Sequence, residues 1–280
     1  MSQTSKTNPS NVDDLLKGAQ QTGDLSAEAL RVVKSIPNMG AKIKANLGIN
    51  MKEVLAAEVV LITILVDDSG SIASAGNTTI VREGYNLVVE ALNDVKKNLK
   101  NNILIATHYL NGTVLYPYVL LQDTIKMDAQ NYNERHFGGT PLYDRTVEIL
   151  STVITKTQES VDDGTPARSI TLIITDGEDC GSRTHSAHDV KVLVDDMLNK
   201  ENHIIAAMGI DNNGRTDFRQ IFKEMGIRDE WILTPGKDTD DEEEKRKKIR
   251  EAFCMFSQSA VRASQTAGSF SKTSANGFAG

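Results

Sequence analysis

VDDSGSI, residues 66–72, begins at the last residue of the apolar run VVLITILV at residues 59–66. The run is continuously aliphatic and rich in β-branched residues, which is typical of a strand buried on both faces of a parallel sheet. Two acids and two serines around a single glycine are costly at the end of such a strand unless their charge is balanced. We therefore expect a cation where this strand ends.

Outward from this strand, strand-like and helical segments alternate along the chain. Apolar residues recur at helical spacing in residues 78–99, 141–158, 188–200 and 215–226, and strand-like runs cover residues 103–109, 114–121, 169–175, 203–210 and 230–235. Asn111-Gly112 separates two of these runs and is a strong hairpin signal, so that pair is expected to be antiparallel. The pattern predicts an α/β fold, a doubly wound, mostly parallel sheet with one antiparallel edge strand.

The remaining segments are expected to flank this α/β domain. Residues 1–22 are polar and predicted to be flexible, and the last residues are rich in Ser, Gly and Ala. Between them and the domain we expect helices that pack on it. The expected units are a flexible segment at 1–22, a helical extension at 23–57, the α/β domain at 58–235, a C-terminal helix at 236–265 and a flexible tail at 266–280.

Composition excludes several classes of partner. The net charge is -7 at pH 7, whereas binding to nucleic acid leaves a basic footprint. The N-terminus lacks the pattern of a secretory signal, and the longest apolar run, residues 59–66, is too short to cross a bilayer. Cys180 and Cys254 lie far apart in sequence. We therefore expect a reduced, cytoplasmic protein that binds neither nucleic acid nor membrane.

Small oxygen donors gather where three segments leave the expected sheet. In open α/β sheets ligands bind outside the carboxyl ends of the strands, so these positions are the ones to inspect. Carboxylate and hydroxyl oxygens without His or Cys suit a hard cation such as Mg²⁺ or Mn²⁺. The candidate metal ligands are Asp67, Ser69, Ser71, Thr140 and Asp176.

These three motifs, D-x-S-G-S, G-G-T and T-D-G, together resemble the von Willebrand factor type A (VWA) domain of the intracellular prokaryotic type. The resemblance covers residues 58–235 and includes the metal-ion-dependent adhesion site (MIDAS) of that family. It implies that the five candidate ligands hold Mg²⁺, with Mn²⁺ or Ca²⁺ as alternatives. It further implies that an Asp or Glu carboxylate of a protein partner completes the coordination, and that the chain is a non-enzymatic adaptor or a subunit of a multiprotein assembly. AAA+ ATPase partners and bacterial stress or tellurite-resistance systems are settings in which such proteins occur.

Two other functions remain open from the sequence. A Mg²⁺-dependent phosphatase-like hydrolase would use Asp67 as the nucleophile, but that chemistry needs a second Asp two residues later, where Ser69 stands. A structural subunit of a homomeric assembly would associate through the terminal helices. A zinc site built from Cys180, His185 and His188 is a weaker interpretation because their spacing matches no common zinc motif, and we expect ordinary surface residues there.

Overall fold

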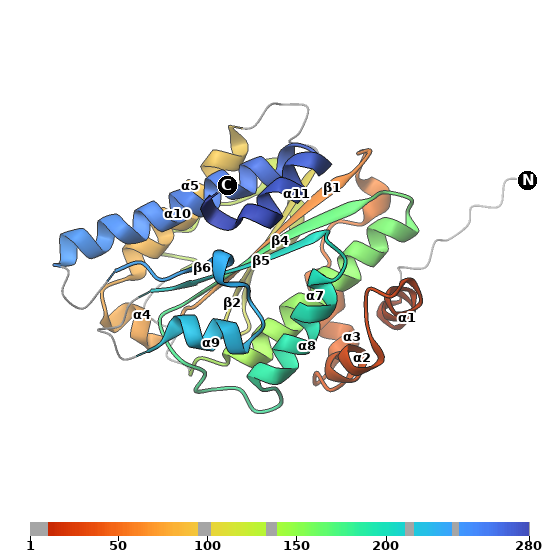
Figure 1. The fold of residues 1–280 in the computed structure, drawn as a ribbon, viewed down its shortest axis with the longest axis horizontal. Coiled ribbons are helices and arrows are strands. Elements are labelled where there is room, and N and C mark those ends of the chain that lie inside the picture. Colours follow the sequence, from red (N-terminus) through yellow and green to blue (C-terminus); the bar gives the residue numbers. More distant parts are fainter. Residues whose placement is uncertain (1–10, 95–101, 133–138, 211–215, 237–240, 280) are drawn as a thin grey trace, which may run out of the picture.

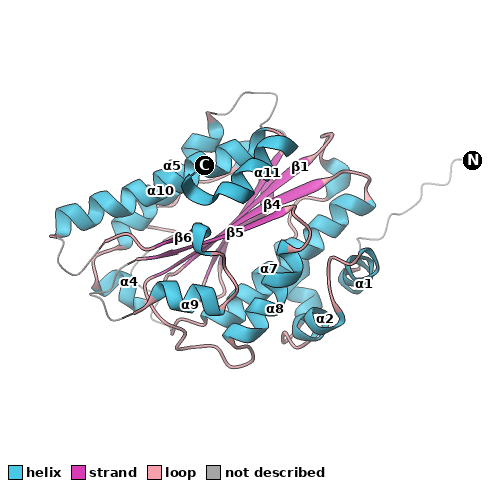
Figure 2. Cartoon of the chain, viewed as in Figure 1, coloured by secondary structure: helices cyan, strands magenta, loops and turns pink. Residues whose placement is uncertain are grey.

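The structure, a computed structural model, describes residues 11–94, 102–132, 139–210, 216–236 and 241–279. Its centre is a six-stranded sheet in the order β3-β2-β1-β4-β5-β6 (Figures 1 and 2). All neighbouring strands run parallel except β2 and β3, which are antiparallel. The predicted fold class, a mostly parallel sheet with one antiparallel edge strand, is confirmed.

The strands follow the apolar runs of the sequence closely. Their bounds are β1 Val59–Val66, β2 Ile103–Tyr109, β3 Val114–Leu120, β4 Ala167–Thr175, β5 His203–Gly209 and β6 Ile232–Leu233. Every residue of β1, β2, β4 and β5 is buried, because helices cover both faces of the sheet. β3 is partly exposed, as befits an edge strand. The turn before it contains Gly112 with a φ of 101°, a conformation that favours glycine.

Helices form a layer on each side of the sheet, and a further layer lies outside one of them (Figure 1). One side carries α5 (Thr78–Asn93), α10 (Glu242–Gln265) and α11 (Ala267–Asn276), and the other carries α7 (Leu142–Asp162) and α8 (Ala187–Leu198). The helices α1, α2 and α3 pack on the outer surface of α7 and α8. These three helices are α1 Val12–Thr22, α2 Ala27–Lys34 and α3 Met39–Asn46, and the short helices are α4 Gly70–Ser74 and α9 Phe218–Glu224.

α1 occupies much of the segment that the sequence predicted to be flexible. Its N-terminus is capped by Asn11, whose side-chain oxygen accepts a hydrogen bond from the backbone N–H of Asp13 at 3.2 Å. It ends at Gly23, which has a φ of 78°. Its apolar face is buried against α7. The polar composition of the segment gave no sign of this tertiary contact. We also expected residues 1–10 to be flexible, and these residues lie outside the described part of the chain.

The C-terminal segment also differs from the flexible tail that we expected. α11 starts after Thr266, whose hydroxyl accepts the backbone N–H of Ser269 at 3.0 Å. Beyond it, Phe278 contacts Trp231 edge to face, with ring centroids 4.8 Å apart. Phe270 is buried as well. These aromatic side chains anchor a segment that is otherwise Ser-, Gly- and Ala-rich.

No helix in the described ranges combines the length and the apolar character that a membrane span would need.

α7 is buried along most of its length because the sheet covers one side and α1 and α3 cover the other. Even the Lys156 ammonium is buried there, where it pairs with Glu159 at 2.8 Å. The N-terminal helices are therefore part of the packed structure that supports α7.

We expect Gly84→Ala to destabilise the protein by about 1–3 kcal/mol through overpacking. A Cβ atom at Gly84 of α5 would overlap the ring of Phe253 on α10, which is fully buried. The matched control is Gly40→Ala in α3, because a Cβ atom there meets nothing within 4 Å. Urea unfolding of both variants measures the difference. A Gly84→Ala protein as stable as the Gly40→Ala protein would contradict the close packing of α5 and α10.

Candidate metal centre

Pairing of β1 with β4 brings two carboxylates to adjacent strand ends. Val66 is in register with Ile174, and the backbone N–H of Asp67 donates to the carbonyl of Ile174 at 2.9 Å. Asp67 therefore leaves β1 beside the point where Asp176 leaves β4. Both aspartates have 0% exposure. The sheet register thus places two acids together without access to bulk water.

The Asp67 carboxylate is held by hydrogen bonds to both oxygens. Its Oδ1 accepts the backbone N–H of Ser69 at 2.8 Å, and its Oδ2 accepts the Thr175 hydroxyl at 2.6 Å. Its backbone carbonyl accepts the hydroxyl of Tyr132 at 2.6 Å. These contacts fix the carboxylate in one orientation at the strand end.

Hydroxyl groups connect the first motif to the third. The Ser69 and Ser71 hydroxyl oxygens lie 2.8 Å apart, and Ser71 donates to Oδ1 of Asp176 at 2.7 Å. Ser69 is the residue that precedes α4, so the turn into this short helix presents both serines on one side. Four of the five candidate ligands thus form one hydrogen-bonded array.

Thr140 reaches the same place from the loop before α7. Its residue exposure is 3%, and its backbone N–H donates to Sγ of Cys180 at 3.1 Å. A Cβ atom at Gly177 would lie 3.8 Å from the Thr140 hydroxyl, so this hydroxyl faces the backbone next to Asp176. The structure therefore brings all five sequence-predicted residues together. The neighbouring His136 and Phe137, which the sequence offered as residues that could shape specificity, lie outside the described residues.

The electrostatics of the site favour a bound cation. Burial, and to a smaller extent the nearby Asp67 carboxylate, raise the pKa of Asp176 to about 7. The pKa of Tyr132 is raised well above its usual value by burial and by the surrounding aspartates. A divalent cation would relieve this excess of negative charge, and the all-oxygen donor set fits Mg²⁺, Mn²⁺ or Ca²⁺.

Sequence reasoning did not foresee the contacts that three further residues make with the candidate ligands. Thr175 and Cys180 flank the third motif and contact Asp67 and Thr140 respectively. Their proximity in sequence to Asp176 was the available signal. Tyr132 lies in a long loop, and its hydroxyl donates to the backbone carbonyl of Asp67, which is 65 positions away in the sequence. Local sequence pattern gives no signal for a contact between residues so far apart.

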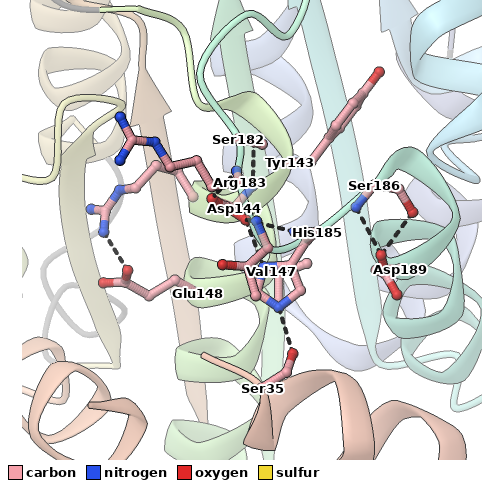
Figure 3. Close-up of polar contacts among 12 residues, drawn as sticks. Ser35, Tyr143, Asp144, Val147, Glu148, Ser182, Arg183, His185, Ser186 and Asp189 are labelled. Atoms are coloured by element: carbon pink, nitrogen blue, oxygen red, sulfur yellow. Dashed lines mark hydrogen bonds and ion pairs between the residues drawn. The ribbon is translucent and has the colours of Figure 1, made fainter. Parts of the chain in front are cut away.

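The alternative zinc site is not assembled. Cys180 and His188 are exposed, as expected for surface residues, but His185 is buried and the expectation of a surface residue was wrong for it. Nδ1 of His185 lies 2.8 Å from Oδ1 of Asp144, and its Nε2 lies 2.9 Å from the hydroxyl of Ser35 (Figure 3). Within the described ranges, no group of three or more His, Cys, Asp or Glu residues is placed to hold a metal ion.

Comparison with known proteins supports the fold. No family model matches the chain, and no curated protein matches its sequence. Two crystal structures of the pilus adhesin SpaC from Lactobacillus rhamnosus GG match with TM-scores of 0.51 and 0.50 and identities of 14% and 12%. Each match covers 73% of this chain but only 31% and 30% of the adhesin.

Proximal thread matrix protein 1 from the mussel byssus, in a structure with a zinc-occupied MIDAS motif, matches with a TM-score of 0.41 and 14% identity. That match covers 70% of this chain and 46% of the byssus protein. The TM-score of the byssus protein is too low to support an argument, so we rely on the likeness to SpaC. At 14% identity that likeness shows the fold alone. The chain has the VWA fold that its three motifs led us to expect.

Replacement of Asp176 by Asn is expected to stabilise the metal-free protein at pH 8, by about 1–3 kcal/mol, because it removes a buried charge next to Asp67. The pKa of Asp176 is about 7 in the folded protein and higher than in the unfolded chain. Its protonated form therefore supports folding at low pH, and that support is lost as the pH rises through about 7. The advantage of the variant should accordingly shrink as the pH falls from 8 to 5.

Urea unfolding in EDTA across this pH range measures the effect. Asp123→Asn serves as the matched control, since Asp123 is exposed and follows β3, whose antiparallel course ends at the edge of the sheet opposite the candidate ligands. A variant at Asp176 that is less stable than the unmodified protein at pH 8 would show that the buried carboxylate is not strained by its surroundings.

Proposed function

We propose that this protein is a metal-dependent protein-interaction module whose five clustered oxygen donors hold Mg²⁺, with Mn²⁺ or Ca²⁺ as alternatives. The ligands in this proposal are Asp67, Ser69, Ser71, Thr140 and Asp176. The observation that carries it is the hydrogen-bonded array at neighbouring strand ends. In this array Asp67 accepts the backbone N–H of Ser69, the Ser69 and Ser71 hydroxyls contact each other, and Ser71 donates to the buried Asp176 carboxylate. The same hydroxyl oxygens have lone pairs that can turn to a cation in place of their present partners.

Charge counting explains why such a site would bind a carboxylate from outside. Asp67 and Asp176 together at most neutralise a divalent cation, and the three hydroxyl ligands are neutral. An octahedral cation bound by few carboxylates keeps positions for water or for an external ligand. Ser71 is exposed, so the array is open to solvent on its side. An Asp or Glu side chain of a partner protein is the ligand that suits this position.

The surroundings of Asp67 support binding rather than catalysis. Both carboxylate oxygens accept hydrogen bonds, and the residue two positions later is Ser69, which supplies no carboxylic acid. A phosphatase-like reaction needs a general acid near the leaving group. We therefore propose an adaptor or an assembly subunit in the cytoplasm, of the kind that serves AAA+ ATPases or stress-response systems. Self-association would have to use the outer faces of the terminal helices, because their inner faces pack on the domain.

Addition of Mg²⁺ is expected to raise the melting temperature, because a ligand that binds only the folded state stabilises it by about 2.7 kcal/mol at roughly 100 times its Kd. Each kcal/mol corresponds to about 2–4 °C for a chain of this size class. The rise should vanish in Asp67→Ala and persist in the control Asp123→Asn. Thermal unfolding with and without Mg²⁺ measures it, and an equal rise in Asp67→Ala would place the cation elsewhere.

Capture of partners from a native lysate should depend on Mg²⁺ and be lost both in EDTA and in Asp67→Ala. The physical reason is that the cation bridges the protein and the carboxylate of the partner. Mass spectrometry of the Mg²⁺-dependent fraction would then identify the assembly. Capture that is unchanged in EDTA would refute the bridging role, and Mg²⁺-dependent turnover of p-nitrophenyl phosphate that is lost in Asp67→Asn would favour the hydrolase instead.

A further inference from the structure

A cavity lies at the start of β5, between the end of α8 and the helix α11. Its volume is about 350 Å³, which is within the range of small-molecule pockets. Because β4 and β5 run parallel, the start of β5 lies at the opposite edge of the sheet from Asp176, which follows the end of β4. None of the five candidate metal ligands lines the cavity, so it is a separate site from the metal centre.

Two opposite charges line this cavity without pairing to each other. The Arg228 guanidinium and the Glu201 carboxylate both belong to exposed residues, so a molecule in the cavity can reach them. Neither side chain forms an ion pair or a hydrogen bond with another residue in the described ranges. A single unpaired charge is ordinary on a protein surface, but here a cation and an anion without partners line the same cavity.

The charged groups that adjoin these two residues in sequence have partners of their own. Asp229, which follows Arg228, pairs with Arg219 at 2.5 Å and with Lys223 at 2.8 Å. Lys200, which precedes Glu201, pairs with Asp24 at 3.3 Å. These neighbours therefore leave the charges of Arg228 and Glu201 for a ligand.

The end of α8 adds negative potential on the side of Glu201. α8 ends at Leu198, and both Leu198 and Asn199 line the cavity. The backbone N–H of Glu201 donates to the carbonyl of Leu198 at 3.4 Å, which keeps Glu201 beside the end of the helix. The C-terminal end of a helix carries partial negative charge and favours a cation. A cation is thus favoured near α8 and Glu201, and an anion is favoured near Arg228.

A buried imidazole makes the wall of the cavity polar without adding a charge. His203 lines the cavity with 3% exposure, and its Nδ1 lies 2.6 Å from the Ser169 hydroxyl. Burial lowers the pKa of His203 to about 4, although Asp24 acts in the opposite direction. The ring is therefore uncharged at neutral pH, and the lining carries one positive and one negative charge.

We propose that this cavity binds a small zwitterion of the amino-acid class, with its carboxylate at Arg228 and its ammonium group at Glu201. A guanidinium edge matches the two oxygens of a carboxylate, and a carboxylate accepts the N–H groups of an ammonium ion. A ligand without net charge suits a lining whose two charges cancel in sum but do not pair. The Asn199 amide and the hydroxyls of Ser271 and Ser274 suit an uncharged polar side chain on the ligand.

The site is complete only while α11 is docked on the domain. Ser271 and Ser274 belong to α11, and the indole N–H of Trp231 donates to the carbonyl of Ser274 at 3.3 Å. A ligand that contacts α11 together with Arg228 and Glu201 would stabilise the docked position of this helix. The proposal does not rest on metal binding, because none of its contacts involves a candidate metal ligand.

Isothermal titration of the full chain with L-glutamine, in EDTA at neutral pH and low ionic strength, tests this site. Saturable binding is expected, with a loss of about tenfold or more in Arg228→Gln and in Glu201→Gln, because each removes a charge-assisted contact. Ala275→Phe is the third variant: Ala275 lines the cavity and is exposed, so a larger side chain there fills the space and leaves both charges intact. Asp123→Asn should bind as the unmodified protein does, since Asp123 follows β3 at the far side of the sheet from β5.

Analogues that lack one of the two charges define the ligand. Glutaramate, which lacks the ammonium group, and L-glutaminamide, which lacks the carboxylate, should each bind at least about tenfold more weakly than L-glutamine. Binding by either analogue that equals that of L-glutamine would overturn the preference for a zwitterion. Saturation with L-glutamine should also slow amide hydrogen exchange in α11, and unchanged exchange would overturn the placement of the ligand beside this helix.

Two results would overturn the proposal as a whole. One is the absence of saturable binding by L-glutamine, L-serine and glycine betaine alike. The other is binding that is unchanged in Arg228→Gln, Glu201→Gln and Ala275→Phe. Loss of Mg²⁺ binding in Asp67→Ala would affect neither result, so failure of the metal centre and failure of this site are distinguishable.

Discussion

The structure depends on one constraint, the parallel register of β1 against β4. This register fixes Asp67 beside the end of β4 and places Asp176 next to it, with both side chains out of water. Burial and the nearby Asp67 carboxylate then raise the pKa of Asp176, and the hydrogen bond from Ser71 only partly offsets this rise, while Thr175 donates to Asp67. A cation is the group that best satisfies such a pair, and the serine hydroxyls are positioned to share it.

The rest of the molecule keeps the loops around this pair in place. Asp179 accepts the backbone N–H of Tyr143 at 3.2 Å and the hydroxyl of Ser182 at 2.5 Å, which ties the loop after β4 to the start of α7. α7 is in turn enclosed by the sheet and by the N-terminal helices. The candidate metal centre is therefore supported on the side of Thr140 and Asp176 by the packed start of α7.

Local sequence pattern was sufficient for the sheet and for the choice of candidate metal ligands. The apolar run of β1 and the acids and hydroxyls that follow it are contiguous, so these candidates could be identified without knowledge of distant contacts. The alternation of elements and the Asn111-Gly112 turn predicted a mostly parallel sheet with one antiparallel edge strand, but the order of the strands came only from the structure. What could not be read depended on contacts between distant segments: α1 against α7, Phe278 against Trp231, the reach of Tyr132 to Asp67, and the burial of His185. The polar composition of both terminal segments concealed the contacts of α1 and of Phe278. A few apolar residues are enough to fix a helix or a chain end when a surface is present on which they can pack.

The central claim is that the two buried aspartates and their hydroxyl neighbours hold a divalent cation. The most direct test is a crystal of the protein grown with Mn²⁺ and measured for anomalous scattering. Our account predicts one strong peak bounded by Asp67, Ser69, Ser71, Thr140 and Asp176, and no such peak in Asp67→Ala crystals. A site without anomalous density at saturating Mn²⁺, or a peak among other residues, would contradict it.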